Sequence, residues 1–121
     1  GQVGRPGYDL DTLLAVAVGV FNQRGFDSTS MEHLSTRLGI SKSSIYHHVA
    51  SKEELLRLAV DRALDALFAA AQAPDTTTGP AIDRLENLVR RSIHVLVDEL
   101  PYVTLLLRIR GNTTVERRAL A

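Results

Sequence analysis

Apolar residues recur at three- and four-residue intervals along most of this chain, which is the spacing of one face of an α-helix. The first such segment covers residues 9–25, begins with acidic residues and stops at Gly25. Its apolar positions are Leu10, Leu13, Leu14, Ala17, Val18 and Phe21. Val16 and Val20 extend the apolar surface almost all round, so we expect this helix to be buried on more than one side.

A short helix is predicted next, over residues 30–38. Thr29 followed by Glu32 fits a capping box, in which side chains satisfy the unpaired N–H groups of a first helical turn. Gly39 supplies the left-handed residue that commonly closes a helix.

A second short helix should follow after a tight turn. Ser41 is a suitable N-cap, and the pattern predicts a helix from residue 42 to about residue 49. Ile45 and Val49 fall on one side of it, which must pack against the preceding helix. The two helices and their turn form a helix-turn-helix.

The opposite side of the second helix is polar. His47 lies at its centre and is flanked by Ser43 and Ser44, and no acidic residue occurs between Glu32 and Glu53. Short hydroxyl side chains and an imidazole near a helix N-terminus allow a close approach to base edges in the major groove of DNA. We therefore predict that Ser43, Ser44 and His47 read bases. The alternative is an ordinary helix pair whose outer face is only solvated.

Phosphate contacts are expected from residues around this face, because cationic and hydroxyl side chains bind the DNA backbone. The candidates are Arg5, Thr29, Lys42, Tyr46, His48 and Lys52. Arg5 belongs to residues 1–8, which are rich in glycine and proline and indicate a mobile arm. Such an arm can place an arginine in a minor groove, or it can be a tail with no role.

A long helix without glycine or proline is predicted over residues 52–73, with Ser51 as its N-cap. It would run for roughly 30 Å at the rise of an α-helix. Residues 74–80, PDTTTGP, are the clearest break in the chain and predict a hinge or loop.

The remaining residues, 81–121, also show helical spacing. An amphipathic helix should end at Pro101, and a further helix should span residues 101–110. Thr113 with Glu116 forms another capping box, and the sequence stops at Ala121 within the helical pattern that follows. This stop favours a fragment of a longer protein.

Composition narrows the class of protein. The 121 residues are 45% hydrophobic and 23% charged, which suffices for one modest core. A net charge of zero normally argues against nucleic-acid binding, but the average hides the acid-free stretch that contains Arg37, Lys42 and Lys52. There is no cysteine, and the histidines match no metal-binding or catalytic motif, so we expect no metal, no cofactor and no enzyme activity. No membrane span or signal peptide is evident, which predicts a cytoplasmic protein.

The string GISKSSIYHHVASKEELL resembles the signature of the TetR (AcrR-like) family of bacterial transcription regulators. Gly25-Phe26, Thr29-Ser30 and Gly39 also match the places where that family has its helix boundaries, and the similarity covers roughly residues 9–60. The resemblance implies an all-α fold, with a three-helix DNA-binding head at residues 9–51. Residues 52–121 would then be the start of a helical ligand-binding and dimerisation domain that looks incomplete in this chain.

The same resemblance implies a homodimeric repressor on a palindromic operator in double-stranded DNA. A small-molecule effector would shift the long linking helix and release the DNA. The polar candidates for the effector site are His94, Tyr102, Thr104 and Arg108, and the leucines at 105–107 would suit a hydrophobic or acyl-type effector. The alternative function is a helical protein-interaction or dimerisation module that does not bind DNA.

Overall fold

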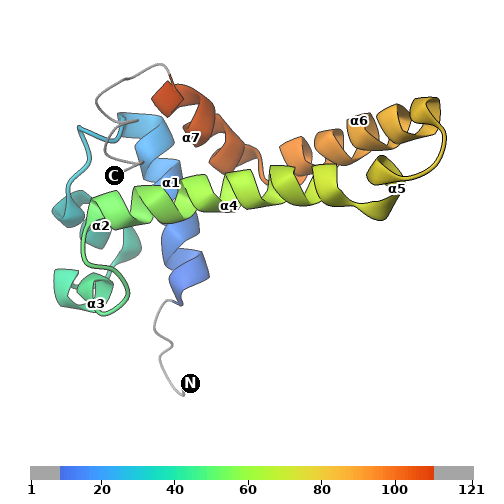
Figure 1. Ribbon diagram of the computed structural model, residues 1–121. Coiled ribbons are helices and arrows are strands. Elements are labelled where there is room, and N and C mark those ends of the chain that lie inside the picture. Colours follow the sequence, from blue (N-terminus) through green and yellow to red (C-terminus); the bar gives the residue numbers. More distant parts are fainter. Residues whose placement is uncertain (1–8, 111–121) are drawn as a thin grey trace.

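The computed structural model describes residues 9–110, and every regular element in that range is an α-helix (Figure 1). The helices are α1 (Leu10–Arg24), α2 (Met31–Leu38), α3 (Lys42–Tyr46), α4 (Lys52–Gln72), α5 (Pro74–Thr77), α6 (Ala81–Asp98) and α7 (Leu100–Arg110). The predicted all-α class is confirmed. The predicted contact residue Arg5 and the predicted capping box of Thr113 and Glu116 lie outside the described residues.

Helix α1 has the predicted bounds and burial. The Asp9 carboxylate accepts a hydrogen bond of 2.8 Å from the Thr12 N–H at its start. Gly25, at a φ of 92°, ends it by donating its N–H to the Phe21 carbonyl. Leu13 and Val20 are among its buried residues, and the helix packs against α2, α4 and α7. It is therefore the centre of the core.

The start of α2 corrects one prediction. The capping box is formed by Ser30 and His33, one residue later than the predicted pair of Thr29 and Glu32. Thr29 is 2% exposed and its hydroxyl donates to the Gly25 carbonyl at 2.8 Å. Because Thr29 is packed inside, the next hydroxyl in the chain caps the helix. Gly39 closes α2 in the left-handed conformation, as predicted.

Helix α3 is shorter than predicted. It ends at Tyr46, and His47 and His48 lie in the turn that follows. The N–H groups of His48 and Val49 both donate to the Ile45 carbonyl, so the chain tightens and turns toward α4. Ile45 and Val49 are buried in the core, as the sequence pattern requires.

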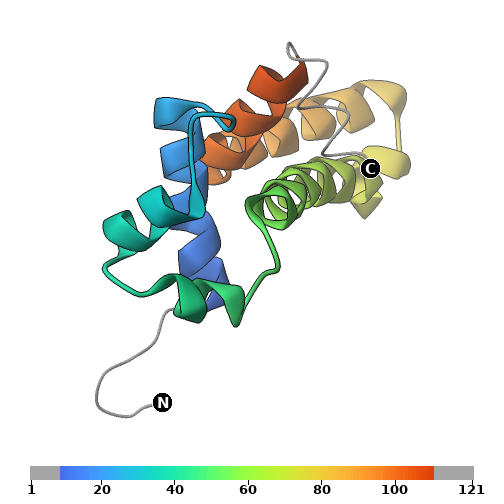
Figure 2. The same cartoon turned by 90° about the vertical axis from the view of Figure 1, so that its left-hand side faces the viewer.

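Helix α4 runs from the end of the molecule that holds α2 and α3 toward α5 (Figure 1). Ser51 caps its start by accepting from the Glu54 N–H at 3.2 Å, as predicted. Leu55, Leu56 and Ala59 in its first half are buried, whereas Phe68 in its second half is exposed. Figure 2 looks along α4 and shows α1, α2 and α3 gathered around the end where it begins.

The predicted loop at residues 74–80 contains a short helix, α5, which begins at a proline. The carboxylate of Asp75 in α5 binds the guanidinium of Arg91 in α6 at 2.8 Å and 3.1 Å. This ion pair holds α5 against α6. The boundary between α6 and α7 also differs by a few residues from the prediction. Pro101 lies in the first turn of α7, where the missing N–H group of proline removes no helical hydrogen bond.

Helix α7 returns to the core and packs on α1 and α4. Its buried residues include Tyr102, Val103, Leu105 and Ile109. By contrast, α6 has no buried residue, and Ile82 and Val97 on it are each 70% exposed. No helix within residues 9–110 is both long enough and apolar enough to cross a membrane.

Candidate nucleic-acid interface

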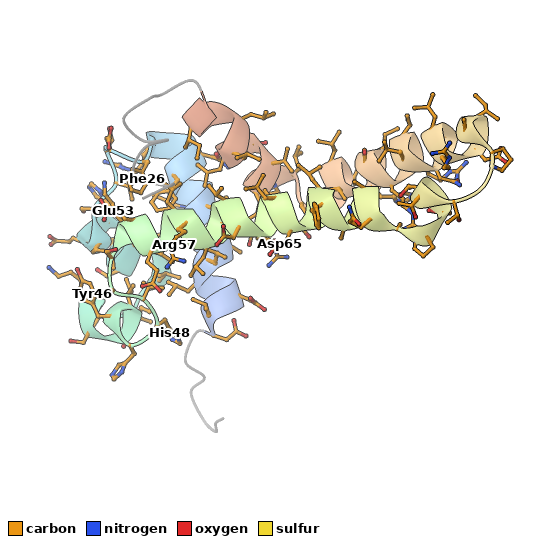
Figure 3. All side chains as sticks on the ribbon, viewed as in Figure 1. Phe26, Tyr46, His48, Glu53, Arg57 and Asp65 are labelled. Carbon is orange, nitrogen blue, oxygen red and sulfur yellow. The ribbon has the colours of Figure 1, made fainter. Side chains whose placement is uncertain are left out.

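The polar residues of α3 and its following turn lie at one end of the molecule. Lys42, Ser43, His47 and His48 are exposed, and Tyr46 is 50% exposed. Figure 3 shows Tyr46 and His48 at this end, away from α5 and α6. Ile45 is fully buried and fixes α3 to the core, so the polar residues are held on a rigid support.

Ser43 and Ser44 differ in their surroundings although they are neighbours. Ser44 is half-buried, its N–H donates to the Ser41 hydroxyl at 3.2 Å, and the two hydroxyl oxygens are also 3.2 Å apart. Ser43 is exposed, and its carbonyl accepts from the His47 N–H. The Ser43 hydroxyl is therefore the more accessible of the two to a partner molecule.

Two of the predicted phosphate contacts have internal roles in the structure. The buried Thr29 hydroxyl cannot reach a phosphate in this conformation, which corrects its predicted role. The Lys52 ammonium donates to the carbonyls of Phe26 and Thr29 at 2.7 Å and 2.8 Å. It also lies 4.3 Å from the centroid of the Phe26 ring. Lys52 thus anchors residues 25–29 to the start of α4, a role that sequence reasoning missed.

The start of α1 lies close to the end of α3 (Figure 1). The Thr12 N–H lowers the pKa of the Asp9 carboxyl by its hydrogen bond, and the nearby His48 imidazole lowers it slightly further. The point at which the described chain begins is therefore on the same side of the molecule as the polar residues of α3.

The four predicted effector residues differ in their surroundings. Tyr102 is 6% exposed, and this burial raises the pKa of Tyr102. It lies under the Arg62 guanidinium, whose central carbon is 4.5 Å from the centroid of the Tyr102 ring. Arg108 is at the other end of α7, where it donates to the Asn22 carbonyl at 2.8 Å. Thr104 is half-buried on α7 and His94 is exposed on α6. An effector-binding role for these four residues stays a prediction.

His94 does line a groove of about 320 Å³ between α4 and α6. The other lining residues are Ala66, Ala69, Ala70, Arg91, Val95, Asp98 and Glu99. The small alanine side chains of α4 leave this space. In the part of the chain that the structure describes, no three His, Asp or Glu side chains gather as a metal-binding group.

A polar contact beside the groove joins α4 to the junction of α6 and α7. Arg62 binds the Glu99 carboxylate through Nε at 2.6 Å and through Nη2 at 3.4 Å. This hydrogen-bonded pair raises the pKa of Arg62. Together with the contact between Arg62 and Tyr102, it joins the middle of α4 to both later helices, and nothing in the sequence pattern indicated it.

Comparison with known proteins gives a consistent picture. Residues 13–59 match the model of the family described as bacterial regulatory proteins, tetR family. The HTH-type transcriptional repressor KstR2 from Mycobacterium tuberculosis is 33% identical over 84 residues, which are 69% of this chain and 42% of the repressor. The chain thus spans less than half the length of this curated relative.

Two solved structures extend the similarity beyond the matched family region. SCO3833, a member of the TetR transcriptional regulator family from Streptomyces coelicolor A3, is 60% identical with a TM-score of 0.81, covering 99% of this chain and 59% of that one. The ketosteroid transcriptional regulator KstR2 of Mycobacterium tuberculosis is 28% identical with a TM-score of 0.74, covering 98% of this chain and 62% of that one.

Proposed function

Because this chain belongs to the TetR family of bacterial regulatory proteins, we propose that it binds double-stranded operator DNA through α3 and regulates transcription. The observation that carries the proposal is the exposed, acid-free surface of α3 and its turn, formed by Lys42, Ser43, Tyr46, His47 and His48. Buried Ile45 and Val49 hold this surface rigidly, as a protein that reads a groove requires.

The proposed DNA-contacting side chains fall into two groups, those suited to base edges and those suited to phosphates. Ser43 in α3 and His47 in the turn that follows are exposed, which suits contacts with base edges, and Ser44 adds a more shielded hydroxyl. Lys42, Tyr46 and His48 lie around them and suit the phosphates on either side. Arg5 of the N-terminal arm would add a contact in the adjacent minor groove.

Lys52 has a double role in this proposal. Two of its three N–H groups hold residues 25–29, and the third is left for a DNA phosphate. The carbonyls that it binds precede α2, so the same ammonium orients the first helix of the helix-turn-helix. We propose that Thr29 supports this arrangement from inside and does not contact DNA.

The proposal also assigns a function to each part of the chain. Residues 9–51 would be the DNA-binding head, and residues 52–121 would begin a ligand-binding and dimerisation domain. The head and α7 share one hydrophobic core, and Arg108 and Pro101 of α7 both hydrogen-bond to Asn22 of α1. A displacement of α7 would therefore reach the head directly as well as through α4.

A hydrophobic or acyl-type effector is proposed for the groove between α4 and α6. Its floor of alanines is apolar, and His94 and Arg91 supply polar groups at its edge. The description of KstR2 as a ketosteroid transcriptional regulator supports an apolar ligand class. An effector that separates α6 from α4 would pull on the Glu99 and Arg62 pair, tilt α4 and change how the two heads of a homodimer meet a palindromic operator.

One observation favours the alternative of a protein-interaction module that does not bind DNA. The apolar side chains of α6 are exposed, and exposed apolar surface often marks a protein contact. Dimerisation through this region is compatible with both functions. DNA binding by α3 is therefore the property that separates them.

The test is an electrophoretic mobility shift with the DNA that flanks the protein's own gene. His47→Ala should relax sequence preference at one base position by about 1–3 kcal/mol. His94→Ala is the matched control, since it makes the same change on α6, far from α3, and should leave the preference unchanged. A retained preference in His47→Ala would show that α3 does not dock as proposed, and no shift with any DNA would favour the interaction module.

The effector is tested in the same assay by adding hydrophobic acids and their thioesters. A compound that abolishes the shift should do so less effectively in an Ala69→Phe variant, whose larger side chain fills the groove. Equal potency in this variant would place the effector elsewhere.

A further inference from the structure

A notch of about 210 Å³ lies between α1 and α2, apart from the DNA-reading residues of α3. Val20 and Arg24 line it from α1, and His33, Thr36 and Arg37 line it from α2. Arg24, His33 and Arg37 are all exposed. The notch is therefore an open, basic recess that a small solute can enter.

The hydrogen bonds of His33 fix which of its ring nitrogens carries the proton. The Ser30 N–H lies 3.0 Å from His33 Nδ1, and a backbone N–H can only donate. Nδ1 must then be the acceptor, so the neutral imidazole carries its hydrogen on Nε2. His33 consequently presents an N–H group to the notch.

That N–H group faces a second donor. Arg24 Nη2 lies 3.3 Å from His33 Nε2, and a guanidinium has no acceptor atom. The two groups cannot hydrogen-bond to each other in this state. No acceptor lies between these two donors. An oxygen atom of a third molecule would accept a hydrogen bond from each of them.

Neither Arg24 nor Arg37 forms an ion pair with another residue of the described range 9–110. The ion pairs there involve Arg57, Arg62 and Arg91. Arg37 donates to the neutral Gln23 side chain at 3.0 Å. Arg24 Nε also donates a long hydrogen bond of 3.4 Å to the Ser28 carbonyl.

We propose that this notch binds a phosphate-type oxyanion. One oxygen would accept from both His33 Nε2–H and Arg24 Nη2, and the Arg37 guanidinium would supply a second charge from across the recess. A tetrahedral oxyanion suits donors that converge from two helices, because it offers several strongly accepting oxygens. The oxyanion is either a phosphate of the DNA backbone or a free phosphate group, and the two sources share this chemistry.

The experiment titrates the protein with inorganic phosphate at constant ionic strength, with chloride as the compensating salt. Side-chain NMR signals of Arg24, His33 and Arg37 should shift and saturate. His33→Glu should abolish the response, because its carboxylate can accept from the Ser30 N–H as a capping-box residue does and can also pair with Arg24. Gln72→Glu, which introduces a carboxylate at an exposed position at the end of α4, should respond as the unmodified protein does.

Thermal unfolding shows whether the His33→Glu protein folds. If it does not, a second variant, Arg24→Gln, still tests the proposal. Arg24→Gln removes one charge-assisted hydrogen bond and should weaken phosphate binding about tenfold. The salt dependence of duplex DNA binding then identifies the source. A slope that is smaller by about one in Arg24→Gln identifies a phosphate of the DNA backbone, and an unchanged slope with a saturable phosphate response identifies a free anion.

The proposal is overturned if the phosphate response is linear and the DNA salt slope is also unchanged by Arg24→Gln. It is equally overturned if a folded His33→Glu protein responds to phosphate as the unmodified protein does. The phosphate titration contains no DNA, so its result is independent of whether the proposed DNA binding through α3 is correct.

Discussion

Replacing Lys52 by methionine should destabilise the DNA-binding end of the molecule. Methionine keeps most of the length and the apolar stem of lysine but removes the ammonium group. In the structure that ammonium makes three contacts, since it donates to the Phe26 and Thr29 carbonyls and lies over the Phe26 ring. The substitution therefore tests whether the lysine is an anchor or only a surface charge.

The magnitude follows from these three contacts. A hydrogen bond from a charged donor contributes about 1.5–3 kcal/mol when it is shielded, and a cation–π contact at a partly exposed site adds about 0.5–1 kcal/mol. The site is only partly buried, so water can replace some of the lost bonds at the two carbonyls. We therefore expect Lys52→Met to lower the free energy of unfolding by about 2–3 kcal/mol.

Urea unfolding followed by circular dichroism measures this loss. Lys42→Met is the matched control, because Lys42 is an exposed lysine on α3 and its replacement should change stability by less than about 0.5 kcal/mol. The DNA salt slope should be measured for both variants under conditions in which they remain folded. Each should lose about one unit of slope if its ammonium contacts a phosphate.

Equal stability of the two variants would refute the reasoning. Lys52 would then be a surface charge, and the two short contacts to Phe26 and Thr29 would contribute nothing measurable to folding. A loss of stability in Lys52→Met without any change in slope would confirm the anchor and remove Lys52 from the set of DNA contacts.

Four further predictions concern other parts of the fold. Ile45→Ala should lower the free energy of unfolding by about 2–4 kcal/mol in urea, because it leaves a cavity at a fully buried position under α3. Gly39→Ala should cost about 1 kcal/mol in the same assay, since Gly39 has a φ of 72° and alanine is strained there. Arg62→Gln should cost about 1 kcal/mol, with a non-zero coupling to Glu99→Gln in a double-mutant cycle; the modest figure reflects the partial exposure of the pair. Asp9 should titrate by NMR below the ordinary range of an aspartate, because the Thr12 N–H lowers its pKa. Its stabilisation of the start of α1 should be complete above the ordinary pKa of an aspartate and should disappear as the pH falls through its lowered value, so a normal titration would contradict the capping geometry.

Local chemistry explains where sequence reasoning succeeded. The starts of α1, α3 and α4 were predictable because Asp9, Ser41 and Ser51 cap the helix that directly follows each of them. Gly25 and Gly39 similarly mark ends that need unusual backbone angles. Ile45 and Val49 were predicted to face the core, and both are buried.

The wrong predictions concern positions where two local patterns were equally plausible and the packing of the core decided between them. Thr29 and Ser30 are both good N-caps, and Ser30 is used because the core takes Thr29. Residues 47–49 are compatible with continued helix, but the chain must turn into α4, so α3 ends at Tyr46. Tertiary structure also decides the surroundings of the effector candidates, since His94 lines the groove between α4 and α6, whereas Arg108 donates to the Asn22 carbonyl of α1.

The sequence by itself determined the helical class, the caps of α1, α3 and α4, and the polar, acid-free face of α3, because each depends on residues a few positions apart. Only the tertiary structure decided that Lys52 reaches back to residues 25–29, that Arg62 joins Glu99 and Tyr102, and that Arg24 meets His33. These contacts join residues on different elements, from 9 to 40 positions apart in the chain. No local propensity encodes them, because they exist only once the shared core of α1, α4 and α7 has brought the helices together.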